Sequence, residues 1–198
     1  MDDARLLQQL DFISELDRLK LILRRISIIG ESRLENSAEH SWHLGVMATV
    51  LAEYAPEGVD IGRATRMLLI HDVVEIDAGD TFCFDEEANL DKEDREARAA
   101  DRLFGMLPGS QGAELRALWD EFESVDTPTA RYANALDRFQ GLIMNYGNKG
   151  GTWHEYGVSM EQILKRMDPI REGAPALWPL ALRLIREAMA GRDAEAPV

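Results

Sequence analysis

The feature that most limits how this chain can fold is the helical spacing of its apolar residues, which recurs along most of its length. After Asp60, a suitable N-cap, four residues follow the i, i+3, i+4, i+7 pattern: Ala64, Met67, Leu68 and His71. An α-helix turns about every 3.6 residues, so this spacing places the four side chains on one stripe. The pattern predicts a helix whose last inward-facing residue is His71.

Seven other segments carry helical spacing or helix start signals. The first should bury a stripe from Leu6 to Leu23, the second should be capped by Ser37, and a later one should begin at Thr127-Pro128. These seven helices are expected at residues 6–23, 37–53, 91–107, 114–123, 127–146, 158–167 and 176–189. No segment shows the sustained alternation of a half-buried strand. We therefore expect an all-α single domain over residues 1–198, a bundle of about seven to eight helices, with a disordered tail at residues 191–198.

Composition limits the partners and the compartment. The 198 residues include 22 basic and 36 acidic side chains, so the formal net charge of −14 repels nucleic acids. No apolar run approaches the roughly 18 residues that a membrane span needs. Cys83 is the only cysteine, which excludes an intrachain disulfide, and the start Met1-Asp2-Asp3 lacks the pattern of a signal peptide. We expect a soluble cytoplasmic protein that acts on a small molecule.

Side chains able to bind metal gather around His71-Asp72. Glu75 follows on the same helical stretch, His40 lies in the first turn of the second helix, and Asp137 lies beside a buried helix face. Any one of these residues could equally be a structural group, either a helix cap or a hydrogen-bonded polar residue of the core, and not a metal ligand. Together, two imidazoles and two carboxylates on facing helices can hold a divalent metal, either Mn, Co, Fe, Mg or Zn, and leave positions open for water and substrate.

Three motifs also resemble a known family in residue type, order and separation. They are Arg33-Leu34-Glu35-Asn36-Ser37-Ala38-Glu39-His40-Ser41, His71-Asp72-x-x-Glu75-x-x-x-Gly79-Asp80 and Ala135-Leu136-Asp137. From about Leu16 to at least Tyr146, the chain is similar to the HD-domain metal-dependent phosphohydrolases, specifically their 5′-deoxynucleotidase-like branch.

The resemblance implies a role for each matching residue. Four residues would hold the divalent metal: His40, His71, Asp72 and Asp137. Glu75 would orient or deprotonate the attacking water. Arg24, near the end of the first helix, would grip the substrate phosphate, while Asp80 and Arg33 would lie on the substrate side of the pocket. The implied reaction is hydrolysis of a nucleoside 5′-monophosphate to nucleoside and phosphate by a homodimer.

Two departures leave the substrate open. Arg25 stands where characterised members often carry an aromatic residue, and residues 80–86 lack the proline-bearing loop common in that branch. The alternatives are another phosphate ester, such as a nucleoside triphosphate or a guanosine alarmone, and a non-catalytic helical sensor of nucleotide or metal. Four further polar residues are interpreted as core or surface groups outside the site: His43, Glu121, Glu123 and His154.

Overall fold

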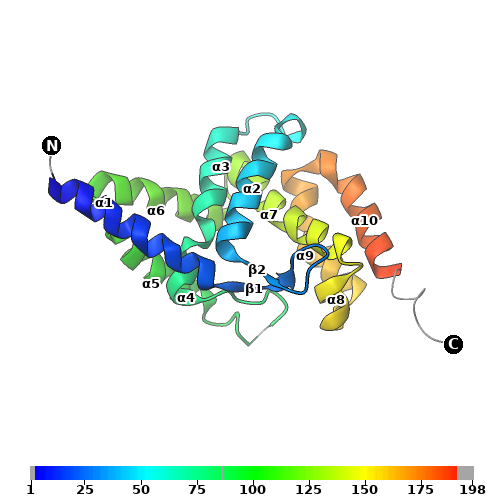
Figure 1. The fold of residues 1–198 in the computed structure, drawn as a ribbon. Coiled ribbons are helices and arrows are strands. Elements are labelled where there is room, and N and C mark those ends of the chain that lie inside the picture. Colours follow the sequence, from blue (N-terminus) through cyan, green and yellow to red (C-terminus); the bar gives the residue numbers. More distant parts are fainter. Residues whose placement is uncertain (1–2, 86, 191–198) are drawn as a thin grey trace.

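The computed structural model describes residues 3–85 and 87–190, and over these residues the chain is all-α, as predicted, apart from one small hairpin (Figure 1). The α-helices are α1 Asp3–Leu16, α2 Ser37–Val50, α3 Ile61–Ile70, α4 Glu75–Ala78, α5 Lys92–Gly105, α6 Gly109–Ser124, α7 Pro128–Gly147, α8 Gly151–Glu155, α9 Met160–Gly173 and α10 Trp178–Ala190. Of these described helices, all but α4 and α8 have at least ten residues, which agrees with the expected number. The tail expected at residues 191–198 lies outside the described residues.

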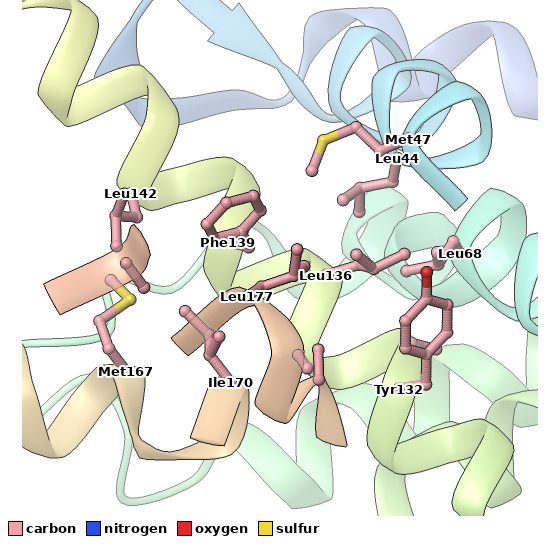
Figure 2. Close-up of a cluster of buried hydrophobic side chains, with 14 of the residues drawn as sticks. Leu44, Met47, Leu68, Tyr132, Leu136, Phe139, Leu142, Met167, Ile170 and Leu177 are labelled. Carbon is pink, nitrogen blue, oxygen red and sulfur yellow. The ribbon is translucent and has the colours of Figure 1, made fainter. Parts of the chain in front are cut away.

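Helix α7 is central because other helices cover it from several sides. It begins as predicted: Thr127 Oγ1 accepts a hydrogen bond from Ala130 N at 3.0 Å, and Pro128 occupies the first turn. Helices α2, α3, α9 and α10 pack around α7, and their apolar side chains meet in the core shown in Figure 2. Tyr132 and Leu136 of α7 have no exposed surface. This packing fixes the direction in which the neighbouring residues of α7 point.

A second core lies against α5 and α6 and anchors the turn between α3 and α4. Val73 and Val74 of that turn pack with Leu103 and Phe104 of α5. The turn itself, His71–Val74, is a 3₁₀ helix rather than a continuation of α3. Its tighter winding lets the valines enter the core while its first two residues face elsewhere.

Helix α1 corrects one prediction. The stripe expected to be buried is open to solvent, with Leu6, Leu10 and Ile13 exposed by 44%, 47% and 60%. The helix meets the second core through Phe12 instead, and Leu19 in the following turn does the same. The apolar pattern predicted a helix here, but α1 ends at Leu16 and not at Leu23. The pattern did not predict the packing, because no element within the described part of the chain covers that face.

The small hairpin is a second feature that the sequence analysis predicted wrongly. Strand β1, Leu23–Ser27, pairs antiparallel with β2, Leu34–Asn36, although the sequence predicts no strand and places Leu23 at a helix end. The burial alternates along β1: Arg24 and Ile26 are half-buried, whereas Leu23 and Arg25 are exposed. A charged residue on the inner face concealed this alternation from a hydropathy pattern. Arg24 therefore lies in a strand and not near the end of a helix.

No helix among the described residues is long and apolar enough to cross a membrane.

The contact between α7 and α9 depends on Gly173, and its substitution should show this. A Cβ atom at Gly173 would overlap the Arg131 carbonyl oxygen, so we expect Gly173→Ala to lower the free energy of unfolding by roughly 1–3 kcal/mol in denaturant titrations. Gly105→Ala is the matched control, because a Cβ there meets nothing within 4 Å and alanine favours a helix. Equal stability of the two variants would contradict the close approach.

Candidate metal centre and substrate pocket

The start of α2 directs His40 into the protein. Asn36, rather than Ser37, is the N-cap: its side chain accepts a hydrogen bond from Glu39 N at 3.0 Å, and its backbone N donates to Glu39 Oε2 at 3.1 Å. This reciprocal capping box fixes the first turn of α2. His40, one residue after Glu39, consequently has no exposed surface.

His71, Asp72 and Asp137 come from two other elements. His71 and Asp72 open the 3₁₀ turn that follows α3, and both are buried. His71 Nδ1 lies 2.9 Å from the Leu68 carbonyl oxygen, so Nδ1 is the donor and Nε2 is turned toward the other ligands. Asp137 is also buried, next to Leu136 of the core.

The four side chains meet at short distances. His40 Nε2 lies 3.0 Å from Asp137 Oδ1 and 3.9 Å from Asp72 Oδ2. His71 Nε2 lies 2.9 Å from Asp72 Oδ1. One candidate ligand atom from each of His40, His71 and Asp72 lies within 4.8 Å of the others. The structure therefore brings the whole predicted ligand set together.

These donor atoms fit a divalent metal. His71 Nε2 is buried without a hydrogen bond of acceptable geometry, although Asp72 Oδ1 lies beside it. An imidazole nitrogen left without a partner next to a carboxylate oxygen is expected where both atoms face one cation. Two imidazoles and two carboxylates form the mixed nitrogen and oxygen set that suits such ions.

The charges of the ligands agree with this assignment. Burial alone would raise the pKa of the Asp72 carboxyl, but His71 and Arg24 hold that pKa well below its usual range. Burial would likewise raise the pKa of Asp137, which Arg138 in particular keeps low. Burial would lower the pKa of the His71 imidazole, yet the charge of Asp72 raises it to about 9. Both carboxylates are charged, whereas His71 holds a proton that a metal must displace.

Glu75 lies beside the ligands at the start of α4. Its side chain is buried, and Oε2 accepts a hydrogen bond from Ser37 Oγ at 2.5 Å. Burial and the negative charge of Asp72 raise the pKa of this carboxyl well above its ordinary value. A carboxylate whose pKa is raised is a stronger proton acceptor than an ordinary carboxylate. Ser37, which the sequence suggested as a helix cap, instead orients this acid.

Arg24 and Asp80 lie in the same pocket as the ligands. Arg24 Nη1 donates to Asp72 Oδ2 at 2.8 Å. Burial would lower the pKa of the Arg24 guanidinium, but Asp72 and Glu75 raise it above its ordinary value, so Arg24 stays positively charged. Burial raises the pKa of the Asp80 carboxyl, although Arg24 opposes that effect. Both side chains line the pocket beside the ligands.

Arg33 is the one predicted site residue that the structure places elsewhere. Its guanidinium is exposed and donates two hydrogen bonds of 2.9 Å to Glu39. Because Glu39 belongs to the capping box of α2, Arg33 supports the start of that helix from the solvent side. It does not line the pocket among the described residues.

Of the four polar residues interpreted as lying outside the site, three lie away from the pocket and one lines it. His154 Nε2 lies 3.1 Å from the Ala188 carbonyl oxygen, His43 Nδ1 lies 3.3 Å from Gln140 Nε2, and Glu121 pairs with Arg63. None of these three residues lines the pocket, whereas Glu123 does.

Glu35 is a buried residue of the site that sequence reasoning missed. Its Oε2 lies 3.5 Å from His40 Nδ1 and 3.6 Å from Arg24 Nε, and its Oε1 accepts a hydrogen bond from Gln140 Nε2 at 2.8 Å. A carboxylate behind a ligand histidine orients the ring and makes it a stronger ligand. The available signal was its place in the motif of His40, but a residue just before a helix commonly lies at the surface.

The remaining walls of the pocket combine aromatic and basic side chains. The loop after Asp80 contributes Phe82 and Phe84, whose ring centroids are 5.5 Å apart, and Phe82 lies 4.7 Å from the ring of Tyr156. Helices α7 and α9 contribute Arg138 and Arg166. Sequence reasoning missed both arginines, because neither belonged to an expected motif position.

Comparison with known proteins agrees with this geometry. The model of the HD domain family matches residues 16–178. Among curated proteins, the 5′-deoxynucleotidase HDDC2 of Bos taurus is 29% identical over 109 residues, which cover 55% of this chain and 52% of that protein. The Danio rerio protein of the same name is 26% identical over 132 residues, or 64% of each chain. The chain thus spans about half to two thirds of the length of these relatives.

Two solved structures share the fold. A Magnetospirillum magnetotacticum protein described as a predicted metal-dependent phosphohydrolase is 52% identical, with 94% of each chain covered and a TM-score of 0.90. A Pyrococcus horikoshii protein is 20% identical, with 89% of this chain and 98% of that chain covered and a TM-score of 0.66. The second likeness concerns the fold alone.

Metal binding should release a proton from His71. Because burial and Asp72 together leave the pKa of His71 at about 9, the imidazole is protonated at neutral pH and must lose its proton to bind. We expect metal affinity to rise roughly tenfold between about pH 7 and pH 8, measured by calorimetry in two buffers of different ionisation enthalpy. His154→Ala should preserve this dependence. An affinity independent of pH would contradict the role of His71.

Proposed function

We propose that this chain, which belongs to the HD domain family, is a metal-dependent phosphohydrolase that releases phosphate from nucleoside 5′-monophosphates. The names of the curated relatives and the description of the Magnetospirillum protein support this class of reaction. The observation that carries the proposal is the convergence of the four candidate metal ligands: His71, Asp72 and Asp137 line one pocket with Glu75 and Arg24, and His40 lies directly behind them against Asp137.

The ligand set would hold one divalent ion, which we propose to be Mn, Co, Fe, Mg or Zn. When bound, such an ion supplies Lewis-acid stabilisation of the charge that develops on phosphoryl oxygens. Asp72 and Asp137 would neutralise its charge, so the remaining groups of the pocket decide how strongly an anionic substrate binds.

Glu75 would act as the general base. Its Oε2 is held by Ser37, and burial together with Asp72 raises the pKa of its carboxyl. Both effects prepare the group to orient a water molecule and to accept its proton as the oxygen attacks phosphorus. Asp77 is unsuitable for this role because it is exposed and paired with Arg102.

Arg24 and the aromatic residues would position the substrate. The Arg24 guanidinium can donate hydrogen bonds to phosphate oxygens, and Asp80 lies near enough to contact the nucleoside side of the substrate. Phe82 and Phe84 offer faces on which a base can stack. Arg25, which is exposed, also lines the pocket.

We also propose that the substrate is a small molecule and that the protein is cytoplasmic. The formal net charge of −14 supports a small substrate and opposes a nucleic-acid polymer as a partner. A cytoplasmic location is supported by the single cysteine, Cys83, whose thiol is free and exposed.

A panel of nucleotides tests the reaction itself. Protein loaded with Mn²⁺ or Co²⁺ should release phosphate from at least one ribo- or deoxynucleoside 5′-monophosphate. Release only from a nucleoside triphosphate or a guanosine alarmone would support the alternative enzyme. Nucleotide binding without release from any compound would support a sensor instead.

Substitution of Glu75 separates turnover from binding. We expect Glu75→Gln to lower kcat by about 10²–10⁴-fold, because a proton acceptor is lost, while metal content is retained. Asp77→Asn is the matched control and should keep wild-type kcat, since Asp77 is exposed on the same short helix. Full turnover by Glu75→Gln would remove Glu75 from the mechanism.

We also propose that the protein is a homodimer, with the outer face of α1 as its contact surface. Leu6, Leu10 and Ile13 present apolar side chains there, and such a face is usually covered by a partner. Light scattering should give about twice the chain mass of 22.3 kDa, and Leu10→Glu should give the monomer, whereas Gln8→Glu on the same helix should not. A monomeric wild type would contradict the dimer, and a dimeric Leu10→Glu variant would contradict this surface.

A further inference from the structure

The basic side chains of the pocket differ in whether an acid neutralises them. Besides His71, five arginine and lysine side chains line it: Arg24, Arg25, Lys92, Arg138 and Arg166. Three of them have acidic partners, since Arg24 pairs with Asp72, Lys92 lies 3.5 Å from Glu96, and Arg138 pairs with Asp137. Arg25 is exposed and therefore hydrated.

Arg166 is the exception, because it is half-buried and lacks a partner. Within the described part of the chain, it makes no hydrogen bond and no ion pair. Burial and the positive charge of Arg138 lower the pKa of its guanidinium, and the negative charge of the nearby Asp137 offsets this only in part. Removing a cation from water without a directly paired acid is unfavourable, so the protein alone compensates the burial of this charge only in part.

The position of Arg166 is nevertheless fixed by the core. Met167, the next residue, and Ile170 are buried against α7 (Figure 2). Their packing holds α9 with Arg166 at the pocket wall, beside the segment that carries Asp137 and Arg138. A cation placed rigidly in a pocket with no acid of its own is suited to bind an anion that enters from outside.

The charge balance of the site indicates which anion this is. Asp72 and Asp137 oppose the charge of a divalent metal and also pair with Arg24 and Arg138. A phosphate monoester brings close to two negative charges at neutral pH. The cations that already have acidic partners in the protein are less available to it than Arg166.

We propose that Arg166 binds oxygens of the substrate phosphoryl group from α9, while Arg24 binds them from β1. This inference rests on the proposed phosphohydrolase function and adds a second phosphate-binding arginine from a part of the chain outside the motifs. The same residue would hold the phosphate product until it leaves. A guanidinium can also donate to a base carbonyl, so the experiment must separate the two ends of the nucleotide.

Inorganic phosphate and an uncharged nucleoside are the probes. Calorimetry on Mn²⁺-loaded protein should show that Arg166→Gln weakens phosphate binding by at least about tenfold, that Arg166→Lys weakens it less, and that nucleoside affinity does not change. Arg171→Ala is the matched control on the same helix, because Arg171 is exposed and pairs with Asp168. It should bind phosphate as the wild type does.

Thermal unfolding distinguishes binding from a structural role. Without phosphate, Arg166→Gln should keep or raise the wild-type Tm, because an unpaired charge is removed; at the same phosphate concentration, the wild type should gain more stability than the variant. Unchanged phosphate affinity in Arg166→Gln, or a loss confined to the nucleoside, would overturn the inference. Phosphate binding needs no turnover, so a chain that hydrolyses no nucleotide but binds phosphate through Arg166 would refute the proposed function alone.

Discussion

The structure depends on the neutralisation of acids buried at one end of a helical core. Glu35, Asp72, Glu75 and Asp137 are each at most 9% exposed, in a chain whose formal net charge is already −14. An uncompensated buried carboxylate costs several kcal/mol, so these side chains need a cation close by. Arg24 lies within ion-pairing distance of Glu35 and Asp72, and it reaches them because it belongs to strand β1 of the small hairpin. A bound divalent metal would complete the same charge balance.

The same segments build the core and the site, which explains how the site is held in place. In the turn between α3 and α4, Val73 and Val74 enter the second core while His71 and Asp72 face the other ligands. On α7, the fully buried Leu136 directly precedes Asp137. A side chain next to a packed neighbour has little freedom to move, so the ligands are positioned before any metal binds.

The sequence was most informative where the determining signal is local. Thr127-Pro128 and Asp60 began their helices as predicted, because an N-cap acts within its own first turn. The α1 stripe was wrongly expected to be buried and strand β1 was missed, since the exposure of Leu10 and the pairing of β1 with β2 depend on elements distant in space or sequence. Local patterns therefore predicted most helices but could not predict what covers them.

In the candidate site, too, the sequence predicted what depends on local signals and missed what depends on distant packing. His40, His71 and Asp72 lie at the ends of predicted helices and Asp137 lies within one, and these candidate ligands converge once the helices pack. Arg33 is close to His40 in sequence but faces solvent, whereas Arg166 is distant from every motif but reaches the pocket because Met167 packs against α7. Proximity along the chain is thus a poor guide to substrate contacts, which depend on how α7 and α9 pack.

The pocket also explains how an acidic protein could bind the phosphate monoester that we propose as its substrate. Its exterior field repels anions at long range, so the attraction must come from a few cations shielded from water, where their interaction is stronger than at the surface. Arg24 and Arg166 occupy such positions, and Phe82 and Phe84 add a flat apolar surface beside them. This combination favours a small molecule with one phosphate and one aromatic group, because a polyanion would leave most of its charges against an acidic exterior. A buried arginine without a directly paired acid reduces stability, and the phosphate group of the proposed substrate would supply the opposite charge that Arg166 lacks.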